Sequence, residues 1–422
     1  MKSEILRNVS LGLLVAGALT VGCSKKTADA NPTSDSDPAP TETITLNHPC
    51  MLHTAADFDL IKEKVNASAQ PWKSGWDVLV ASPYASATYT PSPVATLIRG
   101  GGSKEEPNPD NYASAYRDAA AAYQLAIRWK ITGDNTYADK VVQILNAWAT
   151  TCTAINGDSN KFLASGLYGY QFANAAEIVR GYTGWASADF TKFKNWMTTL
   201  WYPLAADFLQ RHNGTCSSHY WANWDVANMN TVLAIGILTD DTQKINFAID
   251  YFKKGVGSGN IHNTVVYRHK VGTEDLGQCQ ESGRDQGHAT LVIAMVGTFC
   301  QMAYNIGIDL FAYDSNRVLA LAEYTAKYNY HDANGVFLYN VPYVSYTNCD
   351  PVTQNVVSAD GRGTDRPEWE LIYNHYTKVK GIAAKYSQLY AERIRPEGGG
   401  GNYGPNSGGF DQLGFGTLMY SK

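Results

Sequence analysis

The stretch from Gly277 to Val296 brings charged side chains next to an apolar run. Glu281, Arg284, Asp285 and His288 follow at i, i+3, i+4 and i+7, so a helix would place them on one face. Arginine can grip a carboxylate with two parallel hydrogen bonds, and histidine titrates near neutral pH. The first turn of a helix also offers free N–H groups to an anion. We therefore predict a site here that binds an anion and moves a proton; an ion pair beside a core-edge histidine is the plainer alternative.

Two glycines, Gly283 and Gly287, interrupt this charged stretch. Glycine costs roughly 1 kcal/mol relative to alanine inside a helix, so another effect must offset it. Close approach of a second backbone or of a ligand is the usual reason. We expect another backbone or a ligand to come close at these two positions.

A second polar stretch, from His219 to Asn228, precedes the next apolar segment. Its aromatic and amide side chains include Tyr220, Trp221, Asn223 and Trp224. Flat aromatic faces suit sugar rings, and the Asn223 amide can contact a carboxylate. This stretch is therefore predicted to form the lip of a sugar site, with aromatic packing at a helix entry as the alternative.

Two further segments carry polar side chains on predicted helices. The first has four consecutive polar-tipped residues, Tyr373, Asn374, His375 and Tyr376. Only some of them can share one helix face, and an ordinary surface helix explains them equally well. The second has polar residues at every third position, namely Gln171, Asn174 and Glu177. It predicts a polar inner lining.

Composition limits the possible partners. The chain has 422 residues, of which 44% are hydrophobic and 12% aromatic, so it can form a large core. Its 10 Trp and 27 Tyr suit either helical packing or stacking on sugars. The formal net charge of −5 argues against nucleic acid as a partner. A polyanionic substrate would need a local basic patch.

The first residues indicate an export signal. Lys2 and Arg7 precede an apolar run, Leu11 to Val21, that is too short to span a membrane. The run ends at Cys23 in a pattern that resembles a bacterial lipoprotein signal, which would make Cys23 the lipidated residue. We predict a signal peptide over 1–23, a disordered linker over 24–46 and one folded domain over 47–422. The protein is expected to be exported and lipid-anchored in the periplasm or outer membrane of a Gram-negative bacterium.

Helical periodicity dominates the predicted domain. The expected helices cover residues 54–66, 112–132, 136–151, 170–180, 189–212, 221–238, 241–254, 284–306, 314–328 and 366–393. The strand candidates are 265–271 and 336–346, with 410–420 as a short packed strand. Because no fixed repeat period is visible, a regular solenoid fits less well. We predict an all-α fold, an α/α toroid built as an incomplete barrel of six or seven helical hairpins with a few short strands.

The cysteine content fits an exported protein. Six cysteines follow Cys23, namely Cys50, Cys152, Cys216, Cys279, Cys300 and Cys349. An even number permits disulfides, and the absence of any CxxC pair argues against a zinc cluster. The pairing stays open at this point.

Five segments together resemble the bacterial alginate lyase family, in the branch classed as polysaccharide lyase family 38. They read GQCQESGRDQGH, GYQFANAAEI, ANWDVANM, IYNHY and GFDQLGFGTL, and the resemblance runs from about residue 47 to the end. It implies an α/α toroid that cleaves uronate polymers by β-elimination, with no metal or other cofactor in the chemistry. Alginate is the expected substrate and glucuronan the other candidate; mannuronate or guluronate preference stays open.

Elimination removes the proton at C5, next to the uronate carboxylate, and expels O4. That proton is barely acidic beside a charged carboxylate, so polar groups must stabilise the charge that builds up there. We expect Asn223 and Arg284 to do this and His288 to act as the base. Tyr373 or Tyr376 would be the acid.

The chain departs from related toroid lyases at two points. They usually place Asn and His together in the first motif, whereas Trp224 follows Asn223 here, and they tend to have a catalytic Tyr where this chain offers His288. The base could therefore be His219, and the acid another tyrosine such as Tyr220. The remaining residues expected to bind the sugar chain are Gln171, Asn174, Tyr220, Trp221, Trp224, Gln280, Glu281, Arg366, Asn374 and His375.

Two other classes of function fit part of the sequence. One is a carbohydrate-binding outer-membrane lipoprotein, although a passive binder has no need of Arg284 aligned with His288. The other is a glycoside hydrolase on the same toroid, with Glu281 or Asp285 paired with Glu368. Only a lyase forms an unsaturated uronate that absorbs in the ultraviolet. In each case the protein is expected to be a monomer.

Overall fold

The computed structural model describes residues 43–401 and 410–422. The predicted signal peptide with Cys23, and the predicted linker up to residue 42, lie outside these residues. The end of that linker belongs to the fold: the main-chain N–H of Thr45 donates to the Ile306 carbonyl at 2.9 Å, and Ile44 and Leu46 pack against the core. The folded part therefore begins a few residues before the predicted boundary at 47.

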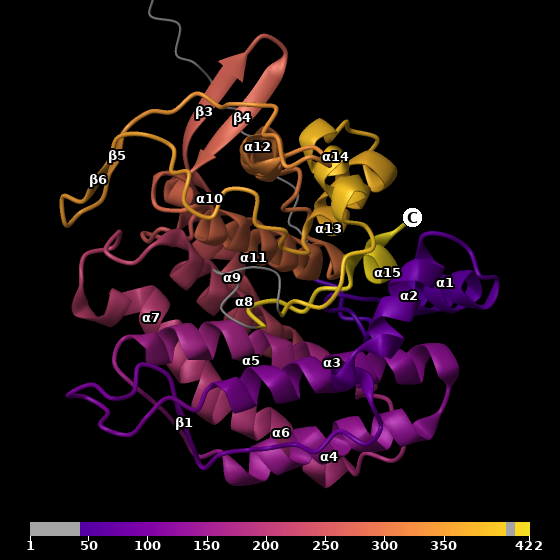
Figure 1. Ribbon diagram of the computed structural model, residues 1–422. Coiled ribbons are helices and arrows are strands. Elements are labelled where there is room, and N and C mark those ends of the chain that lie inside the picture. Colours follow the sequence, from indigo (N-terminus) through magenta and orange to yellow (C-terminus); the bar gives the residue numbers. More distant parts are fainter. Residues whose placement is uncertain (1–42, 402–409) are drawn as a thin grey trace, which may run out of the picture. The chain divides into compact units, whose positions relative to one another are not determined.

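Helices account for most of the described chain (Figure 1). They are α1 (Ala55–Asn66), α2 (Trp72–Ala81), α3 (Ala113–Thr132), α4 (Asn135–Thr151), α5 (Asn160–Val179), α6 (Ser187–Trp196), α7 (Tyr202–Arg211), α8 (Ala222–Leu238), α9 (Thr242–Lys254), α10 (Ile261–Thr264), α11 (Gln286–Asn305), α12 (Tyr313–Asn329), α13 (Trp369–Tyr373), α14 (Lys385–Ile394) and α15 (Gly416–Tyr420). Two π-helical turns, η2 (Met197–Trp201) and η5 (Asn374–Val379), follow α6 and α13.

Local sequence explains most of the helix ends. Thr54 and Asp57 form a capping box at the start of α1, and Gly133, with φ of 74°, ends α3. The helix predicted over 170–180 begins earlier, at Asn160. The one predicted over 366–393 is divided into α13 and α14, because the chain passes through η5 and then Gly381, with φ of 67°.

The inner layer consists of helices that run in the same direction. A Cβ added to Gly166 of α5 would lie 2.7 Å from the main-chain nitrogen of Asn228 in α8. One turn further along both helices, Gly169 faces the side chain of Thr231 in the same way. Because the register advances together, α5 and α8 are parallel, and glycine allows their backbones to touch.

The same direction continues on both sides of this pair. Gln280 contacts the start of α8 through the Ala222 N–H, and Asn230, two turns later, donates to the Met295 carbonyl of α11 at 2.9 Å. On the other side, Tyr168 of α5 stacks on Tyr112 at the start of α3, and further along the two helices Asn174 and Tyr123 contact the consecutive residues Leu52 and His53. Helices α3, α5, α8 and α11 therefore start at one end of the ring, which we call the N-terminal mouth.

Helix α13 also runs parallel to α11. Arg366, just before α13, donates to Thr290 in the first turns of α11, at 3.4 Å. His375, just after α13, packs edge-on against Tyr304 in the last turn of α11, with ring centroids 4.8 Å apart. The start of α13 thus lies toward the N-terminal mouth and its end toward the opposite side.

Each inner helix pairs with an outer helix that returns in the opposite direction. In the first pair, Arg128 near the end of α3 lies over Tyr137 near the start of α4, and Asp118 near the start of α3 accepts from Trp148 near the end of α4. The other outer partners are α6–α7, α9, α12 and α14. Stacked hairpins of this kind form an α/α toroid, as predicted. Helix α15 brings the C-terminus beside α1 and α2 (Figure 1).

Six short strands form three two-stranded sheets in the described chain. Strands β1 (Thr96–Ile98) and β2 (Ala154–Asn156) are parallel, whereas β3 (Val265–Val271) and β4 (Glu274–Cys279) form an antiparallel hairpin, as do β5 (Tyr346–Thr347) and β6 (Thr353–Gln354). The strand predicted over 265–271 is confirmed. The one over 336–346 is wrong, because most of that segment is irregular, and the tail predicted as a strand ends in α15.

A disulfide fixes the β5–β6 hairpin. Cys216 and Cys349 are 133 residues apart in the sequence and form a disulfide, whereas Cys50, Cys152, Cys279 and Cys300 are free and buried. The bond attaches the hairpin to the loop between α7 and α8. That loop leads directly into the N-terminal mouth.

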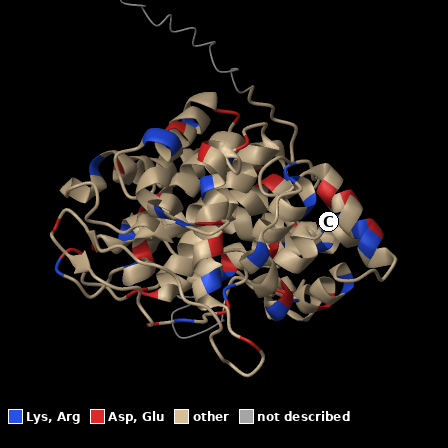
Figure 2. Cartoon of the chain, turned by 90° about the horizontal axis from the view of Figure 1, so that it is seen from above, with Lys and Arg blue, Asp and Glu red and all other residues tan. Residues whose placement is uncertain are grey.

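Charge is mixed over the elements that the structure describes. Figure 2 shows Lys and Arg segments interspersed with Asp and Glu segments, with no face of one sign in that view. None of the described helices is both long enough and apolar enough to cross a bilayer. A polyanion must therefore be bound by basic and polar side chains gathered at one local site.

Candidate active site

The charged stretch that opened the sequence analysis lies at the N-terminal mouth. It is a turn followed by a helix: the 3-10 turn η4 (Gln280–Gly283) follows β4, and α11 starts at Gln286, within two residues of the start predicted for the helix over 284–306. Asp285, with extended φ and ψ of −165° and 163°, is the N-cap of α11. The side chains of this stretch therefore lie at the start of two inner helices.

Glu281 connects the starts of α8 and α11. It is fully buried, and its Oε1 accepts from the Asn223 main-chain N–H at 2.8 Å and from Asn223 Nδ2 at 2.6 Å. Its Oε2 accepts from Arg284 Nη1 at 3.0 Å. A carboxylate is favoured at a helix N-terminus, where it meets unpaired N–H groups and the positive end of the dipole. Glu281 thus holds Asn223 and Arg284 in place.

His288 lies between a carboxylate and a guanidinium. Its Nδ1 is 2.6 Å from Asp285 Oδ2, and its Nε2 is 3.2 Å from Arg284 Nη2. Asp285 Oδ1 also accepts from the His288 main-chain N–H at 2.7 Å. Because the carboxylate accepts a proton at Nδ1, the neutral ring keeps Nε2 as the acceptor. The His288 side chain is 36% exposed, and in this structure its Nε2 accepts from Arg284 Nη2.

Electrostatics keeps Asp285 ionised. Burial alone would raise its pKa, but the hydrogen bonds from His288 and the nearby charges of His288 and Arg284 lower the pKa below the usual 3.8. Sequence reasoning placed Asp285 on the charged helix face, but assigned it a role only as a possible hydrolase carboxylate. Asp285 lies three residues before His288, and an N-cap side chain reaches the residue three positions later. This spacing was the signal that Asp285 could orient His288.

Two aromatic rings line the mouth beside Arg284. The Trp221 ring centroid is 5.8 Å from Arg284 Cζ and 6.3 Å from the Tyr346 ring. The Tyr346 hydroxyl accepts from Gln280 Nε2 at 2.7 Å, and burial raises the pKa of Tyr346 although Gln280 and Ser218 act to lower it. The sequence did not indicate Tyr346, because the disulfide brings it to the site from a distant loop.

Arg366 and Asp411 lie behind the histidine. Arg366 is 1% exposed, and its guanidinium donates to the Gly287 carbonyl at 3.3 Å and lies 3.8 Å from Asp411 Oδ2. Burial raises the pKa of Asp411, while Arg366, Arg99 and His288 act in the opposite direction. The prediction that Arg366 contacts substrate is therefore wrong, because the protein interior encloses it.

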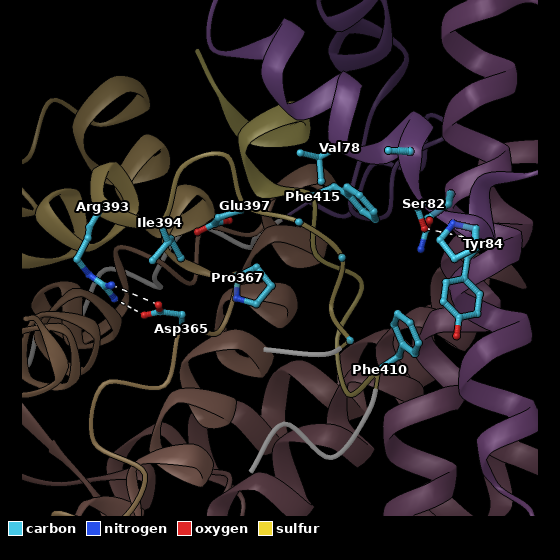
Figure 3. Close-up of a pocket in the computed structure, with 16 residues that line it drawn as sticks. Val78, Ser82, Tyr84, Asp365, Pro367, Arg393, Ile394, Glu397, Phe410 and Phe415 are labelled. Carbon is cyan, nitrogen blue, oxygen red and sulfur yellow. Dashed lines mark hydrogen bonds and ion pairs between the residues drawn. The ribbon is translucent and has the colours of Figure 1, made fainter. Parts of the chain in front are cut away.

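A cavity of about 630 Å³ lies outside this site. Tyr84 and Phe410 line one side, and the ion-paired Asp365 and Arg393 line the other (Figure 3). A second cavity of about 430 Å³ lies against Gln280 and Tyr346. Neither has Arg284 or His288 in its lining.

The segment 373–376 does not reach this site. Tyr376 is fully buried and its hydroxyl donates to the Phe311 carbonyl at 2.8 Å; Asn374 donates to Glu370; and burial lowers the pKa of His375 to about 4. These contacts lie toward the far end of α11, and a helix of 20 residues is about 30 Å long. Tyr373 belongs to the same turn, so the predictions for all four residues are wrong.

The predicted polar lining of α5 is structural. Gln171 Nε2 donates to the Phe410 carbonyl at 2.7 Å, and Asn174 Oδ1 accepts from the Leu52 N–H at 3.2 Å. Both side chains are buried, so they bind main-chain segments that fill the ring and cannot contact a sugar. Gly283 has a similar explanation: a Cβ there would lie 2.2 Å from the Tyr343 hydroxyl, so a protein segment, and not a substrate, comes close.

The polar stretch from His219 to Asn228 has residues at the mouth and residues that support it. His219 Nδ1 is paired with Asp350 Oδ2 at 2.5 Å beside the disulfide, and Tyr220 and Trp224 pack together with ring centroids 4.7 Å apart. Only Trp221 of this group contacts Arg284. Tyr220 and Trp224 therefore support the mouth rather than line it, contrary to the prediction.

The carboxylates of the hydrolase alternative are not arranged as a pair. Glu281 is fully buried and committed to Asn223 and Arg284. Glu368 is also buried, lines a separate cavity of about 30 Å³, and has a pKa that burial raises well above the usual value. Two accessible carboxyl groups across one bond are the requirement for hydrolysis, and these residues do not provide them.

A cluster of metal-ligand types lies elsewhere. His48, Cys50 and Glu177 are close enough to hold an ion together. However, His48 Nδ1 is already 2.5 Å from Glu177 and its Nε2 is 2.7 Å from Asp240, with Arg180 beside them. This is an ion-pair network that joins residue 48 to α5.

The family model described as alginate lyase matches residues 70–334, more than half of the chain. The chain belongs to the alginate lyase family. It is therefore a polysaccharide lyase, a carbon–oxygen lyase that acts on alginate. The matched residues include Trp221, Glu281, Arg284 and His288 of the mouth.

Solved alginate lyases share the fold. Alginate lyase A1-III from Sphingomonas species A1 superposes with a TM-score of 0.59 at 13% identity, over 91% of this chain and 99% of that one. An alginate lyase from Bacteroides ovatus gives 0.57 at 13% identity, over 89% and 100%. A histidine-to-alanine variant of A1-III complexed with a tetrasaccharide gives 0.57 at 14% identity, over 91% and 99%. A comparison with curated protein sequences finds no match.

Proposed function

We propose that this alginate lyase cleaves its polymer at the N-terminal mouth, with His288 as the base and Arg284 as the group that holds the reacting carboxylate. The observation that carries this assignment is the hydrogen-bonded series Asp285–His288–Arg284. It orients one imidazole nitrogen as an acceptor beside a partly exposed guanidinium. Base and carboxylate partner are thus adjacent, as abstraction of a proton next to a carboxylate requires.

The elimination needs these groups and a proton donor for O4. When Arg284 Nη2 donates to the substrate carboxylate instead of to His288, Nε2 of His288 is free to take the proton from C5, the electrons of the C5–H bond form the C4–C5 double bond, and the C4–O4 bond breaks. Arg284 stabilises the charge that builds on the carboxylate while Glu281 keeps the guanidinium in place. O4 leaves with a proton, so the products are a new chain end with a hydroxyl and an unsaturated uronate.

Two variants test the base. His288→Ala is expected to lower kcat on alginate by about 10²- to 10⁴-fold, the usual contribution of a general base, with the fold intact by circular dichroism. His219→Ala is the matched control, because this histidine is nearby but paired with Asp350. Its rate, followed by ultraviolet absorbance of the product, should stay close to the wild type. The reverse pattern would assign the base to His219.

A third variant identifies the proton donor to O4. Both the imidazolium formed at His288 and the Tyr346 hydroxyl can supply that proton. Tyr346→Phe keeps the ring near Trp221 but removes the hydroxyl. An unchanged kcat would assign the donor to His288, whereas a loss of about 10²-fold would assign it to Tyr346.

We also propose export and lipid attachment at Cys23. The charged start, the short apolar run and the cysteine at its end support this proposal. Metabolic labelling with a fatty-acid analogue should label the wild type and not Cys23→Ala. Labelling of both forms, or of neither, would contradict lipid attachment at this residue.

A further inference from the structure

Arg99 is an arginine at the N-terminal mouth that the mechanism does not use. It follows β1, and its main-chain N–H donates to the Asn156 carbonyl at 3.1 Å, so its backbone is fixed by the β1–β2 sheet. Its side chain is partly exposed. The β1–β2 sheet therefore fixes the position of Arg99 and the direction in which its side chain leaves the backbone.

Two tyrosines hold the guanidinium. Nη1 donates to the Tyr168 hydroxyl at 2.8 Å, and Cζ lies 4.8 Å from the Tyr112 ring centroid and 5.7 Å from that of Tyr168. The two rings are stacked, with an angle of 10° between their planes. Stacking on aromatic faces orients the planar fork of an arginine without consuming its N–H donors.

Most of the hydrogen-bonding capacity of Arg99 remains available. An arginine has five N–H donors, and the Tyr168 hydroxyl takes one. Within residues 43–401 and 410–422, no carboxylate lies within the 4.0 Å of an ion pair with this guanidinium. The acidic groups whose fields reach it are Asp110 and Asp411. Asp110 accepts from the Gly101 N–H, and Asp411 is buried against Arg366.

Arg99 and His288 belong to the same mouth. Tyr112 starts α3 and Tyr168 lies in α5, the parallel neighbours of α8 and α11. Asp411 connects the two walls, because its carbonyl accepts from Tyr170 of α5 at 3.1 Å and its Oδ2 lies 3.8 Å from Arg366, which donates to the Gly287 carbonyl at the start of α11. Arg99 therefore occupies the α3–α5 wall, and His288 the start of α11.

The aromatic surface continues beyond Arg99. Tyr116 lies 6.1 Å from Tyr168 and 5.6 Å from Phe410, between ring centroids. Tyr112 and Tyr116 are both partly exposed. Aromatic faces next to a free guanidinium match one unit of a polyuronate chain, which presents a flat sugar ring and a carboxylate.

We propose that Arg99, held by Tyr112 and Tyr168, binds the carboxylate of a second uronate unit, away from the bond that breaks. This inference rests on the proposed function only in that the polymer reacts at His288. Arg99 raises the affinity of the enzyme for long uronate chains and takes no part in proton transfer. A chain that reaches both sites is held at two carboxylates, and a short one at a single carboxylate.

Binding to an inactive enzyme tests this separately from turnover. In the His288→Ala background, calorimetry is run with a trisaccharide and a hexasaccharide of mannuronate. Adding Arg99→Gln should weaken the hexasaccharide about 10- to 100-fold, the range for a lost charge-assisted hydrogen bond, and the trisaccharide by about twofold or less. Arg128→Gln is the matched control, because Arg128 also stacks on a tyrosine, Tyr137, but pairs with the Ala85 carbonyl.

Two results would overturn the proposal. One is equal hexasaccharide affinity with and without Arg99; the other is an equal loss for both lengths, which would place Arg99 at the reacting unit or in the fold. Thermal unfolding of each variant controls for folding. If Arg99→Gln does not fold, Arg99→Lys decides, since it keeps the charge and loses the fork. If His288→Ala retains full turnover, the proposed base is wrong. The binding comparison can then be repeated at low temperature with short chains that react slowly, and it still tests the role of Arg99.

Discussion

Replacing Asp285 by Asn tests how much the orientation of His288 contributes to kcat, because the imidazole itself remains. The Asp285 Oδ2···His288 Nδ1 distance is 2.6 Å, and the lowered pKa of Asp285 keeps the carboxylate charged at working pH. A charge-assisted hydrogen bond of this kind contributes about 2 kcal/mol. At 1.36 kcal/mol per tenfold change in rate, kcat should fall about 30-fold. The loss grows toward that of His288→Ala if the new amide donates to Nδ1 and moves the ring proton to Nε2.

The fold should tolerate this change. Asp285 also caps α11 through the His288 main-chain N–H, and Asn is an equally good N-cap. Asp134→Asn is the matched control, because Asp134 caps α4 through the Thr136 N–H at 2.9 Å. Initial rates on alginate, read as ultraviolet absorbance, give kcat, and chemical denaturation gives stability. If Asp285→Asn stays within twofold of wild type while His288→Ala is inactive, the orienting role is refuted.

Three further outcomes test the corrected site. Tyr376→Phe should leave kcat within about twofold but reduce the free energy of unfolding by about 1–2 kcal/mol, because the Phe311 carbonyl loses its donor; a large fall in kcat would return Tyr376 to the site. His375 has a folded-state pKa of about 4 against 6.5 unfolded, so its contribution to stability is present above pH 6.5 and is lost as pH falls through 4. His375→Phe should therefore remove roughly 2–3 kcal/mol of the stability lost between pH 7 and pH 4.5, measured by denaturant unfolding; an unchanged pH dependence would contradict the burial effect. Replacing Cys216 and Cys349 with Ser should raise KM several-fold with kcat nearly unchanged, because the hairpin that carries Tyr346 loses its attachment; unchanged kinetics would show that the hairpin needs no disulfide.

Much of the helical architecture was predictable because it depends on local patterns. The helices over 112–132, 136–151, 221–238 and 241–254 agree with α3, α4, α8 and α9 to within a residue or so at each end. The meeting of Glu281, Arg284 and His288 was also predictable, since all three lie within eight residues. Such proximity follows from either a helix or a 3-10 turn followed by a helix.

The errors at residues 373–376 have a geometric cause. A sequence shows that residues are polar and helical, but not which end of a helix faces the mouth. The inner helices are parallel, so only residues at their starts reach it: Arg284 and Trp221 do, whereas Tyr376, at the end of α13, does not. The prediction for Gln171 was wrong for a related reason. Main-chain segments such as the one at Phe410 fill the interior of the ring, which the sequence did not show.

The parallel arrangement also explains how a chain with a net charge of −5 can bind a polyanion. Each inner helix directs the positive end of its dipole, equivalent to roughly half an elementary charge, toward the mouth. Glu281 and Asp285 neutralise part of this field at α8 and α11, and in doing so they position Asn223, Arg284 and His288. The start of α3 behaves differently, since its N-cap residue Tyr112 makes no side-chain cap hydrogen bond and instead lies against Arg99. Positive charge at the α3–α5 wall is therefore neutralised less than at the starts of α8 and α11. If that wall contributes to capture, KM on long alginate should rise with ionic strength more steeply than KM on a trisaccharide, and Arg99→Gln should remove the difference.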